Sequence, residues 1–500
     1  FQNCFIFTRI SLQFCQCNSY STILRFYNTP FLTYDYIFIY DSFLLNFSTR
    51  TKDTVSDDAL LKPLPGSVKH FYYGTNIFIT GGTGFLGKAL LEKLLRSCEG
   101  IKCIYILMRQ KRGLNVEQRH KELLKNQIFD RIRDKWPERL EKIRPVEGDV
   151  SQADLGMSPA DTIMLQDQVN IVIHSAATIR FIEPLSEALT LNTLGTKRLI
   201  ELCHKIKSLK SIVHVSTAYS NSDKNSEILE KFYPVEHDPD SLLQCSAALP
   251  QELMDIITPR IQGSHPNTYT LTKALGEQII LKYGAGLPIC IIRPSIGKFV
   301  YSTYNAIRCT FSEKPNLSIM DLVPVDIAVN SCITAAWNHT KYKNEPLIYN
   351  CTSGGTNPLT WYQFSQFAVE HARESPTKYV MMYPNFHYTT NRLANLFWEL
   401  TTHYLPSIVF DIIMKAQGKK PIRFKMATLT GEFFAMNQFT FNIDNMKTLF
   451  EDLEQFDEHT EFLCDVRPVD WKTLGEINFL RVYVIFLYEG LFKERKYRKF

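Results

Sequence analysis

The pattern that most restricts how this chain can fold is an apolar run, a glycine-rich turn and then an amphipathic run. The turn is Thr80-Gly-Gly-Thr-Gly-Phe-Leu-Gly87, with Ile77–Ile79 before it and Lys88–Leu95 after it. A strand, a tight glycine turn and a helix in this order begin a dinucleotide-binding βαβ unit. Gly81 allows the sharp turn, and Gly84 allows backbone N–H groups to approach a pyrophosphate at the helix N-terminus.

The turn and the ends of two later strands supply the expected contacts to the cofactor. The expected residues are Thr80, Gly81, Thr83, Gly84, Phe85, Leu86, Gly87, Asp149, Val150 and Ala176. A carboxylate at Asp149 can accept a hydrogen bond from the adenine amino group. Small side chains around Ala176 leave room for the cofactor ribose, and ordinary close packing explains them equally well.

The end of the second expected strand indicates which nicotinamide cofactor is used. An NAD site places an acidic residue there for the ribose 2′-hydroxyl, whereas an NADP site needs cations for the 2′-phosphate. This chain has Arg109, Lys111 and Arg112 in that position and no carboxylate. We therefore expect NADPH, with a solvated basic loop as the alternative interpretation.

Short apolar runs alternate with helical runs from residue 75 to about residue 345, where the strand pattern fades. The expected strands are Asn76–Thr80, Cys103–Met108, Ile143–Glu147, Val169–His174, Ser211–Ser216 and Pro288–Ile292. The expected helices include Thr190–Lys205, Leu271–Tyr283, Asn391–Tyr404 and Pro406–Gln417. This order predicts an α/β fold, a Rossmann-type doubly wound parallel sheet with a mostly helical C-terminal domain. The expected domains are 67–350 and 351–500.

Net charge and cysteine spacing limit which ligands and partners we expect for this chain. The net charge is +5 and no basic stripe is interleaved with aromatic residues, so we expect no nucleic-acid partner. The twelve cysteines show no CxxC pair and no Cys/His spacing that suits zinc, so we expect no metal. Residues 1–66 show no link to the enzyme pattern and stay unassigned, outside the expected fold. The sequence favours no particular oligomeric state.

Tyr269 and Lys273 are the strongest candidates for catalysis. None of the other 23 tyrosines has a lysine four residues later, and this spacing places both side chains on one face of a helix. Lys273 can lower the pKa of the tyrosine and hold the nicotinamide ribose hydroxyls. Tyr269 can then protonate the oxyanion that hydride attack creates on a carbonyl. Two unrelated neighbours on a helix surface would be the plainer interpretation if the pair stood alone.

Two further positions can complete this site. A hydroxyl at the end of the fifth strand would polarise the substrate carbonyl, and both Ser216 and Thr217 are candidates. Asn192 can anchor a backbone kink or a water behind the lysine, or can be an ordinary residue on a helix surface.

In these motifs the chain resembles an extended short-chain dehydrogenase/reductase and, more closely, a fatty acyl-CoA reductase of the male-sterility type. The resemblance covers about residues 67–490. The matching segments are Thr80–Gly87, Tyr105–Gly113, His174–Phe181, Val213–Tyr219, His265–Leu275, Ile292–Ser295, Val323–Asp326, Tyr349–Ser353 and Leu405–Asp411.

The resemblance implies reduction of a long-chain acyl-CoA to a fatty alcohol, a precursor of waxes or ether lipids, with two NADPH consumed. The thioester would become a hemithioacetal, lose CoA to give an aldehyde, and be reduced again. Tyr269 would serve as the proton donor in both steps, with Thr217 matching the family's hydroxyl position better than Ser216. The long insertion between Thr217 and Tyr269 would help to form the acyl site. The resemblance also places the enzyme inside the cell, on the cytosolic face of the endoplasmic reticulum or of peroxisomes.

The chain departs from the family pattern in two places. The loop at 297–314 replaces a family segment beside the nicotinamide end of the cofactor, which puts turnover in doubt. A catalytically impaired NADP-binding homologue, or a reductase acting on another carbonyl, is therefore the alternative. The C-terminal run Phe479–Tyr488 is too short to span a bilayer and is followed by a basic segment. Peripheral contact with anionic lipid is one interpretation. A buried helix with a charged end is the favoured one.

Overall fold

The computed structural model describes residues 63–111, 113–181, 183–224, 226–295, 309–311, 319–341, 346–374, 387–389, 391–401, 405–416, 433–434, 437–456 and 458–473. The chain divides into residues 1–58 and residues 59–500, and every described residue belongs to the second unit. Four expectations lie outside the described residues: those on residues 1–62, on Arg112, on most of the loop 297–314 and on the basic C-terminus.

Seven parallel strands form the main sheet, in the order β3-β2-β1-β4-β5-β6-β9. They are β1 (Asn76–Thr80), β2 (Cys103–Met108), β3 (Ile143–Glu147), β4 (Ile171–His174), β5 (Ser211–Val215), β6 (Ile289–Pro294) and β9 (Leu347–Cys351). The order reverses between β1 and β4, where Thr80 lies in register with His174. In doubly wound sheets, ligands bind at the carboxyl ends of the strands beside such a reversal.

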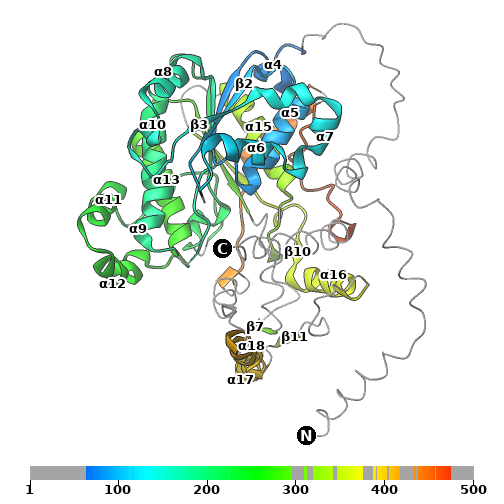
Figure 1. Ribbon diagram of the computed structural model, residues 1–500. Helices are drawn as coiled ribbons and strands as arrows, with labels where there is room; N and C mark the ends of the chain where they lie inside the picture. The colour runs from blue at the N-terminus through cyan, green and yellow to red at the C-terminus, as the bar shows by residue number, and fades with distance from the viewer. Residues whose placement is uncertain are drawn as a thin grey trace. The chain divides into compact units, whose positions relative to one another are not determined.

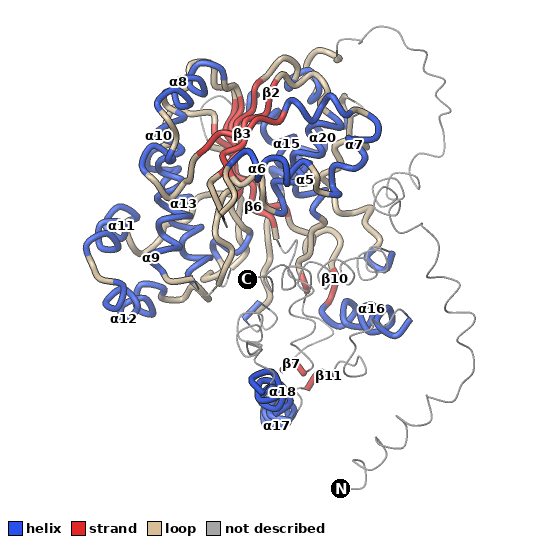
Figure 2. Tube along the Cα trace, in the orientation of Figure 1, coloured by secondary structure: helices blue, strands red, loops and turns tan. Residues whose placement is uncertain are grey.

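Helices cover both faces of this sheet, with α10 and α13 on one side and α5 and α15 on the other (Figures 1 and 2). The helices are α4 (Val68–Tyr72), α5 (Phe85–Ser97), α6 (Val116–Leu124), α7 (Asp130–Lys135), α8 (Pro159–Gln168), α9 (Leu185–Ala188), α10 (Gly195–Cys203), α11 (Pro239–Ala248), α12 (Gln251–Gln262), α13 (Thr268–Tyr283), α15 (Val325–Asn338), α16 (Trp361–Glu374), α17 (Arg392–Glu399), α18 (Leu405–Ala416) and α20 (Asp444–Glu454). Two short pairs stand apart from the sheet: β8 (Ile319–Met320) with β10 (Leu359–Thr360), and β7 (Cys309–Phe311) with β11 (His387–Thr389). The expected Rossmann-type fold is confirmed.

The expected end of the strand pattern near residue 345 is wrong, because β9 follows it at the edge of the main sheet. Its run Leu-Ile-Tyr-Asn-Cys carries a polar residue that argues against a buried strand. In the fold, the Asn350 side-chain amide donates to the carbonyls of Ile228 (3.1 Å) and Asn442 (2.8 Å). These distant partners offset the desolvation of the amide, and sequence pattern alone does not reveal them.

The insertion between Thr217 and Tyr269 folds as two helices, α11 and α12, which lie beside α9 in Figure 1. A small separate core holds them against α13. Its buried members are Leu185, Leu189, Leu242, Met254, Leu271 and Leu275. The insertion is therefore packed against the helix that begins with Thr268 and Tyr269.

The chain after residue 436 returns to the nucleotide-binding sheet. Helix α20 packs on β9 and α15, and the carboxylate of Glu458 accepts hydrogen bonds from the backbone N–H groups of Val68 (2.6 Å) and Lys69 (3.3 Å). Glu461 accepts from the side chains of Lys93 and Ser97 on α5. The proposed boundary at residue 350 falls inside β9.

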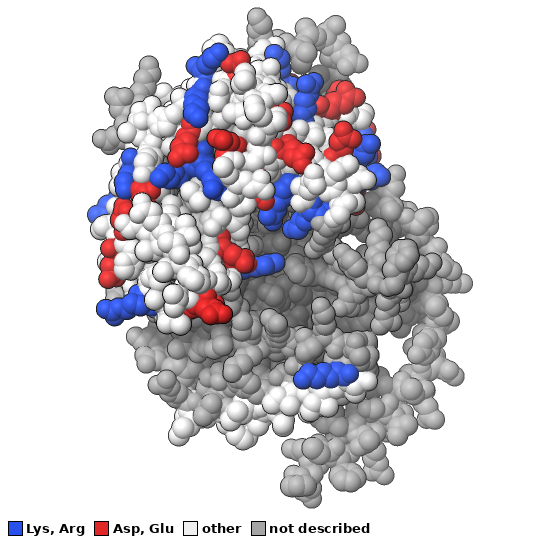
Figure 3. All heavy atoms as spheres, turned by 60° about the vertical axis from the view of Figure 1, so that its left-hand side comes forward, with Lys and Arg blue, Asp and Glu red and all other residues white. Residues whose placement is uncertain are grey.

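No helix among the described residues is long and apolar enough to cross a membrane. On the face shown in Figure 3, lysine and arginine side chains are interspersed with aspartate and glutamate.

Candidate functional site

The glycine turn fits a cofactor pyrophosphate. Gly81 has a φ of +77°, and a Cβ added there would lie 2.6 Å from the backbone nitrogen of Ala176. Gly84 is the N-cap of α5 and makes no side-chain cap bond, and both Gly84 and Phe85 are exposed. The positive end of the helix dipole is therefore reachable at the carboxyl end of β1, as anion binding requires.

The other predicted residues of this turn differ in what they can offer. The Thr80 hydroxyl is buried and lies 2.6 Å from His174 Nδ1, so its side chain belongs to the interior. The Ala176 backbone N–H donates to that same hydroxyl across 3.3 Å. Thr83 and Leu86 are half-buried, and Gly87 is buried against the turn. Val150 is part of the hydrophobic core.

The predicted phosphate-binding and adenine-binding residues lie together. Arg109 donates to the carboxylate of Asp149 across 2.9 Å. The other oxygen of Asp149 accepts from the backbone N–H (3.0 Å) and the hydroxyl (2.8 Å) of Ser151. Lys111 is exposed and closes a tight turn with Leu114.

Arg119 is a cation of this region that sequence reasoning did not single out. It lies on α6, and its guanidinium donates to the backbone carbonyl of Arg109. Burial, followed by the Arg109 charge, lowers its pKa. Arg119 lies on a helix eight residues after Lys111 and belongs to no recognisable sequence motif. Its proximity to Arg109 becomes visible only in the folded chain.

Tyr269 and Thr217 meet where β5 ends and α13 begins. Tyr269 is half-buried in the first turn of α13, and Thr217 is the N-cap of the short helix after β5. Burial raises the pKa of Tyr269 to about 12, and a hydrogen bond with the Thr217 side chain opposes that shift. The expected lowering by Lys273 is not observed. The phenol is therefore protonated at neutral pH, as a proton donor must be.

Lys273 is buried one turn after Tyr269, and its Nζ donates to the backbone carbonyl of Val215 across 2.6 Å. Burial lowers its pKa to about 8, while the charge of Glu277 opposes that shift. Behind it lie two buried histidines, His174 and His214, with ring centroids 5.3 Å apart. Burial and then the Lys273 charge lower the pKa of both rings. Two neutral imidazoles thus lie near the Lys273 ammonium.

Ser216 and Thr217 have different roles in the structure. The Ser216 hydroxyl donates to Glu277 across 2.5 Å, and Ser220 donates to the same oxygen across 3.0 Å. The Ser216 hydroxyl is therefore hydrogen-bonded to Glu277 in the interior, whereas the Thr217 side chain is hydrogen-bonded to Tyr269, the candidate proton donor. This arrangement favours Thr217 over Ser216 as the hydroxyl that contacts the carbonyl.

Asn192 is 2 % exposed, so it is not a surface residue. Its carboxamide accepts from the backbone N–H of Thr178 (2.9 Å) and donates to the Thr272 hydroxyl (3.0 Å). It lies in a π-helical segment, Leu189–Leu194, that interrupts the helix expected over Thr190–Lys205. Single π turns of this kind frequently mark functional sites. Asn192 thus joins the loop after β4 to α13.

An aromatic cluster flanks Tyr269. Its members are Phe181, Tyr219, Phe433, Phe434, Phe439 and Phe441. The Phe181 ring lies 5.8 Å from that of Tyr269 and 5.6 Å from that of Phe434, measured between centroids. Tyr219 contacts Phe434 at 4.9 Å. Residues from the loop after β4, from the end of β5 and from the C-terminal region thus form one apolar surface beside the candidate proton donor.

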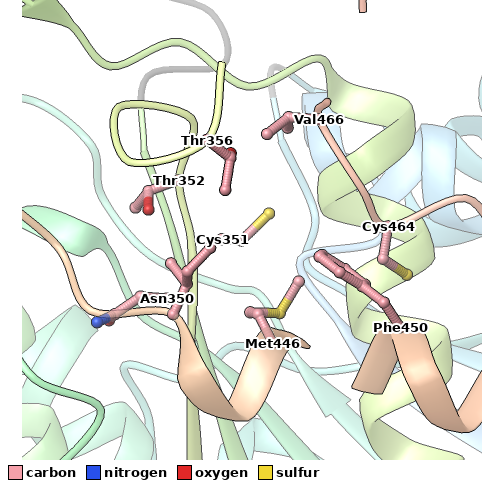
Figure 4. Close-up of a pocket in the computed structure, with 9 residues that line it drawn as sticks. Asn350, Cys351, Thr352, Thr356, Met446, Phe450, Cys464 and Val466 are labelled. Atoms are coloured by element: carbon pink, nitrogen blue, oxygen red, sulfur yellow. The ribbon is translucent and has the colours of Figure 1, made fainter. Parts of the chain in front are cut away.

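A small pocket lies between β9 and α20 (Figure 4). Figure 4 shows Cys351, Met446 and Cys464 facing it. None of its lining residues is a predicted site residue, so we do not assign the reaction to it.

Comparison with known proteins identifies the family of this chain. Residues 79–303 match the family model described as "Male sterility protein". The chain is 35% identical to fatty acyl-CoA reductase 1 of Xenopus laevis over 82% of its own length and 84% of the relative. It is 35% identical to the human protein of the same name over 81% and 83%. It is 31% identical to fatty acyl-CoA reductase 2 of Mus musculus over 85% and 86%.

Solved structures support the fold. The reductase domain of a nonribosomal peptide synthetase from Mycobacterium tuberculosis aligns with a TM-score of 0.54 at 16% identity, over 84% of this chain and 94% of that domain. The terminal R domain of the myxalamid PKS-NRPS pathway gives the same TM-score and identity, over 84% and 93%. The chain carries a nicotinamide-cofactor-binding domain and is an oxidoreductase. From its sequence identity over most of its length, it belongs to the fatty acyl-CoA reductase family.

Proposed function

We propose that this protein reduces long-chain fatty acyl-CoA to a fatty alcohol through an aldehyde, releasing CoA and consuming two NADPH. The observation that carries the proposal is the meeting of Thr217, Tyr269 and Lys273 at the carboxyl end of β5. A protonated phenol, a hydroxyl beside it and a buried ammonium one helical turn away are the groups that carbonyl reduction needs.

The residues of this chain have distinct tasks in that reaction. The cofactor supplies the hydride. Thr217 and Tyr269 bind the carbonyl oxygen, and Tyr269 gives it a proton as negative charge develops there. Lys273 holds the ribose hydroxyls and keeps positive charge close to the site. The thioester becomes a hemithioacetal that loses CoA, and the same residues then serve the aldehyde.

The aromatic cluster supports a long acyl chain as substrate. Apolar and aromatic walls with few polar groups are typical of sites for such ligands. The Phe181 ring touches that of Tyr269, so carbon atoms next to the reacting carbonyl would pass this side chain. Phe434 and Phe439 extend the same surface.

NADPH, rather than NADH, is proposed from the cations at the end of β2. Arg109 and Arg119 lie together there, and a 2′-phosphate would relieve the repulsion between two neighbouring guanidinium groups. Asp149 holds Arg109 in place and stays within reach of an adenine amino group.

We also propose that the enzyme works at a membrane surface, on the cytosolic face of the endoplasmic reticulum or of peroxisomes. A substrate with a long acyl chain and a product without a charged group both favour the lipid phase. Fractionation of cells that express the full chain tests this location.

Purified protein incubated with NADPH and acyl-CoA of several chain lengths, followed by lipid analysis, tests the reaction. We expect fatty alcohol with two NADPH oxidised for each molecule formed. Aldehyde alone, with one NADPH oxidised, would limit the enzyme to the first reduction. Cofactor binding without turnover would overturn the proposal and leave an impaired homologue.

A further inference from the structure

Glu277 is the centre of a buried network that the proposed reaction does not yet use. It lies on α13, and its side chain is 2 % exposed. One carboxylate oxygen accepts from Ser216 (2.5 Å), Ser220 (3.0 Å) and Arg293 Nε (3.0 Å). The other accepts from the second Arg293 nitrogen at 2.7 Å. A fully satisfied buried carboxylate fixes each of its partners in one arrangement.

Ser216 connects this network to the reacting hydroxyl. Ser216 directly precedes Thr217, and its backbone N–H donates to Ile292 in β6 across 2.7 Å. The end of β5 is therefore held from its backbone and from its side chain. A shift of the Ser216 side chain moves the backbone that sets the position of Thr217.

Arg293 connects the network to the insertion. Its guanidinium is 0 % exposed and donates to the carbonyls of Leu229 (3.1 Å) and Lys231 (2.9 Å). The neighbouring Ile228 packs in the aromatic cluster beside Tyr219. One ion pair thus joins the catalytic helix to the segment that carries the proposed acyl surface.

Glu277 also lies one helical turn after Lys273, and its charge favours the ammonium form of that residue. Among the described residues, His174 on β4 and His214 on β5 also lie near Lys273, Tyr269 lies one turn before it on α13, and Arg293 is the cation paired with Glu277. Both imidazoles are neutral, because burial and then the Lys273 charge lower their pKa. Among the described neighbours of Lys273, Glu277 is the group that carries a negative charge.

We propose that Glu277 is a positioning residue for the reduction: its carboxylate orders the Thr217 end of β5 through Ser216, fixes the insertion through Arg293 and lies one helical turn from Lys273. The inference rests on the proposed function for its substrate. Its effects on Lys273 and on cofactor binding are independent of which carbonyl compound is reduced.

The test compares Glu277→Gln with Glu92→Gln. Glu92 forms another buried ion pair, with Arg96 on α5 at 2.8 Å, so its variant reproduces the loss of such a pair away from the site. We expect kcat of Glu277→Gln with acyl-CoA to fall about tenfold to a hundredfold, the range for a small misplacement of reacting groups. The basic limb of its pH profile should move about one unit toward acid. Glu92→Gln should keep the wild-type limb.

Cofactor binding supplies a readout that needs no turnover. Titration of NADPH against pH should show affinity that falls at lower pH in Glu277→Gln than in the wild type, and Glu277→Asp should restore much of the difference. If the wild type fails to reduce acyl-CoA but this shift occurs, the proposed function fails and the effect on Lys273 stands. If Glu277→Gln and Glu92→Gln share one pH dependence, the inference is overturned.

Ser216→Ala covers the case in which Glu277→Gln does not fold. It removes one hydrogen bond and leaves the Glu277–Arg293 pair intact. We expect kcat to fall about tenfold with an unchanged basic limb. Full kcat in Ser216→Ala would overturn the link between Glu277 and Thr217.

Discussion

Arg109 and Asp149 hold each other at the edge of the proposed cofactor site, with a guanidinium nitrogen 2.9 Å from a carboxylate oxygen. The sequence suggests separate tasks for them, the 2′-phosphate for one and adenine for the other. The ion pair links the two tasks. Ser151 fixes the Asp149 carboxylate, and that carboxylate in turn orients Arg109. Half of the Arg109 side chain remains exposed and available to a phosphate.

Arg109→Ala should weaken NADPH far more than NADH. The loss of charge-assisted hydrogen bonds worth about 1.5–3 kcal/mol corresponds to a Kd for NADPH raised about tenfold to a hundredfold. Binding measured by fluorescence for both cofactors checks this, with Arg133→Ala on α7 as the control. Equal losses for NADPH and NADH would refute the phosphate assignment.

Tyr269→Phe should abolish alcohol formation and leave NADPH binding nearly unchanged. The variant keeps the ring packing against Phe181 and removes the proton donor, so we expect kcat to fall about a hundredfold to ten-thousandfold. Thr217→Val should lower kcat less. Product analysis by mass spectrometry gives the rates, and undiminished alcohol output from Tyr269→Phe would exclude this mechanism.

Titration of Lys273 should lower the affinity for NADPH as the pH rises, whereas it should raise the stability of the fold over the same range. Its pKa is about 8 in the fold, below its ordinary value of 10.5. NADPH affinity should therefore fall above pH 8 as the ammonium is lost. Between pH 8 and 10.5 the unfolded chain holds more protons at this group than the folded chain, so its contribution to stability rises with pH. Lys273→Met should remove both effects in binding titrations and thermal melts.

Much of the fold is predictable from local pattern, because most of the strands from β1 to β6 are short, largely apolar runs that are visible without tertiary contacts. The edge strand β9 is not, since Asn350 becomes acceptable in a strand only through partners about a hundred residues away. Tyr269 and Lys273 are proposed as catalytic residues from their spacing. Glu277 and Arg293 are not, because a single acid and a single base in sequence give no sign that they will form a buried pair.

Phe434→Leu and Phe181→Leu should change the preference for acyl chain length. Both rings flank the path proposed for the chain, and one methylene in an apolar pocket is worth about 1–3 kcal/mol of discrimination. We expect the ratio of kcat/KM between long and medium acyl-CoA to change about tenfold. Phe456→Leu, which alters a ring packed on Trp337 instead, is the control. An unchanged ratio in both variants would place the acyl chain elsewhere.

Glu230 should make the fold less stable as the pH rises toward neutrality. Burial raises its pKa to about 7, although backbone N–H groups of Asn350 and Asn445 donate to it. A pKa raised above the unfolded value of 4.5 contributes stability that is lost as pH rises through 7. Glu230→Gln should flatten the melting temperature between pH 4.5 and 7. Exposed Glu236→Gln should leave the wild-type slope, and an identical slope in Glu230→Gln would contradict this assignment.

The contact between the segment near Glu458 and the start of α4 has a consequence for synthesis on the ribosome. The strand β9, the helix α20 and the Glu458 contacts with the start of α4 all come from the last third of the chain. Until residues near 473 have emerged, the main sheet therefore lacks its edge strand β9, the packing of α20 and the hydrogen bonds from α4 to Glu458. A nascent chain stopped at residue 340, before β9, would expose the flank of β6 to other chains, so chaperone engagement should last until residues near 473 have emerged.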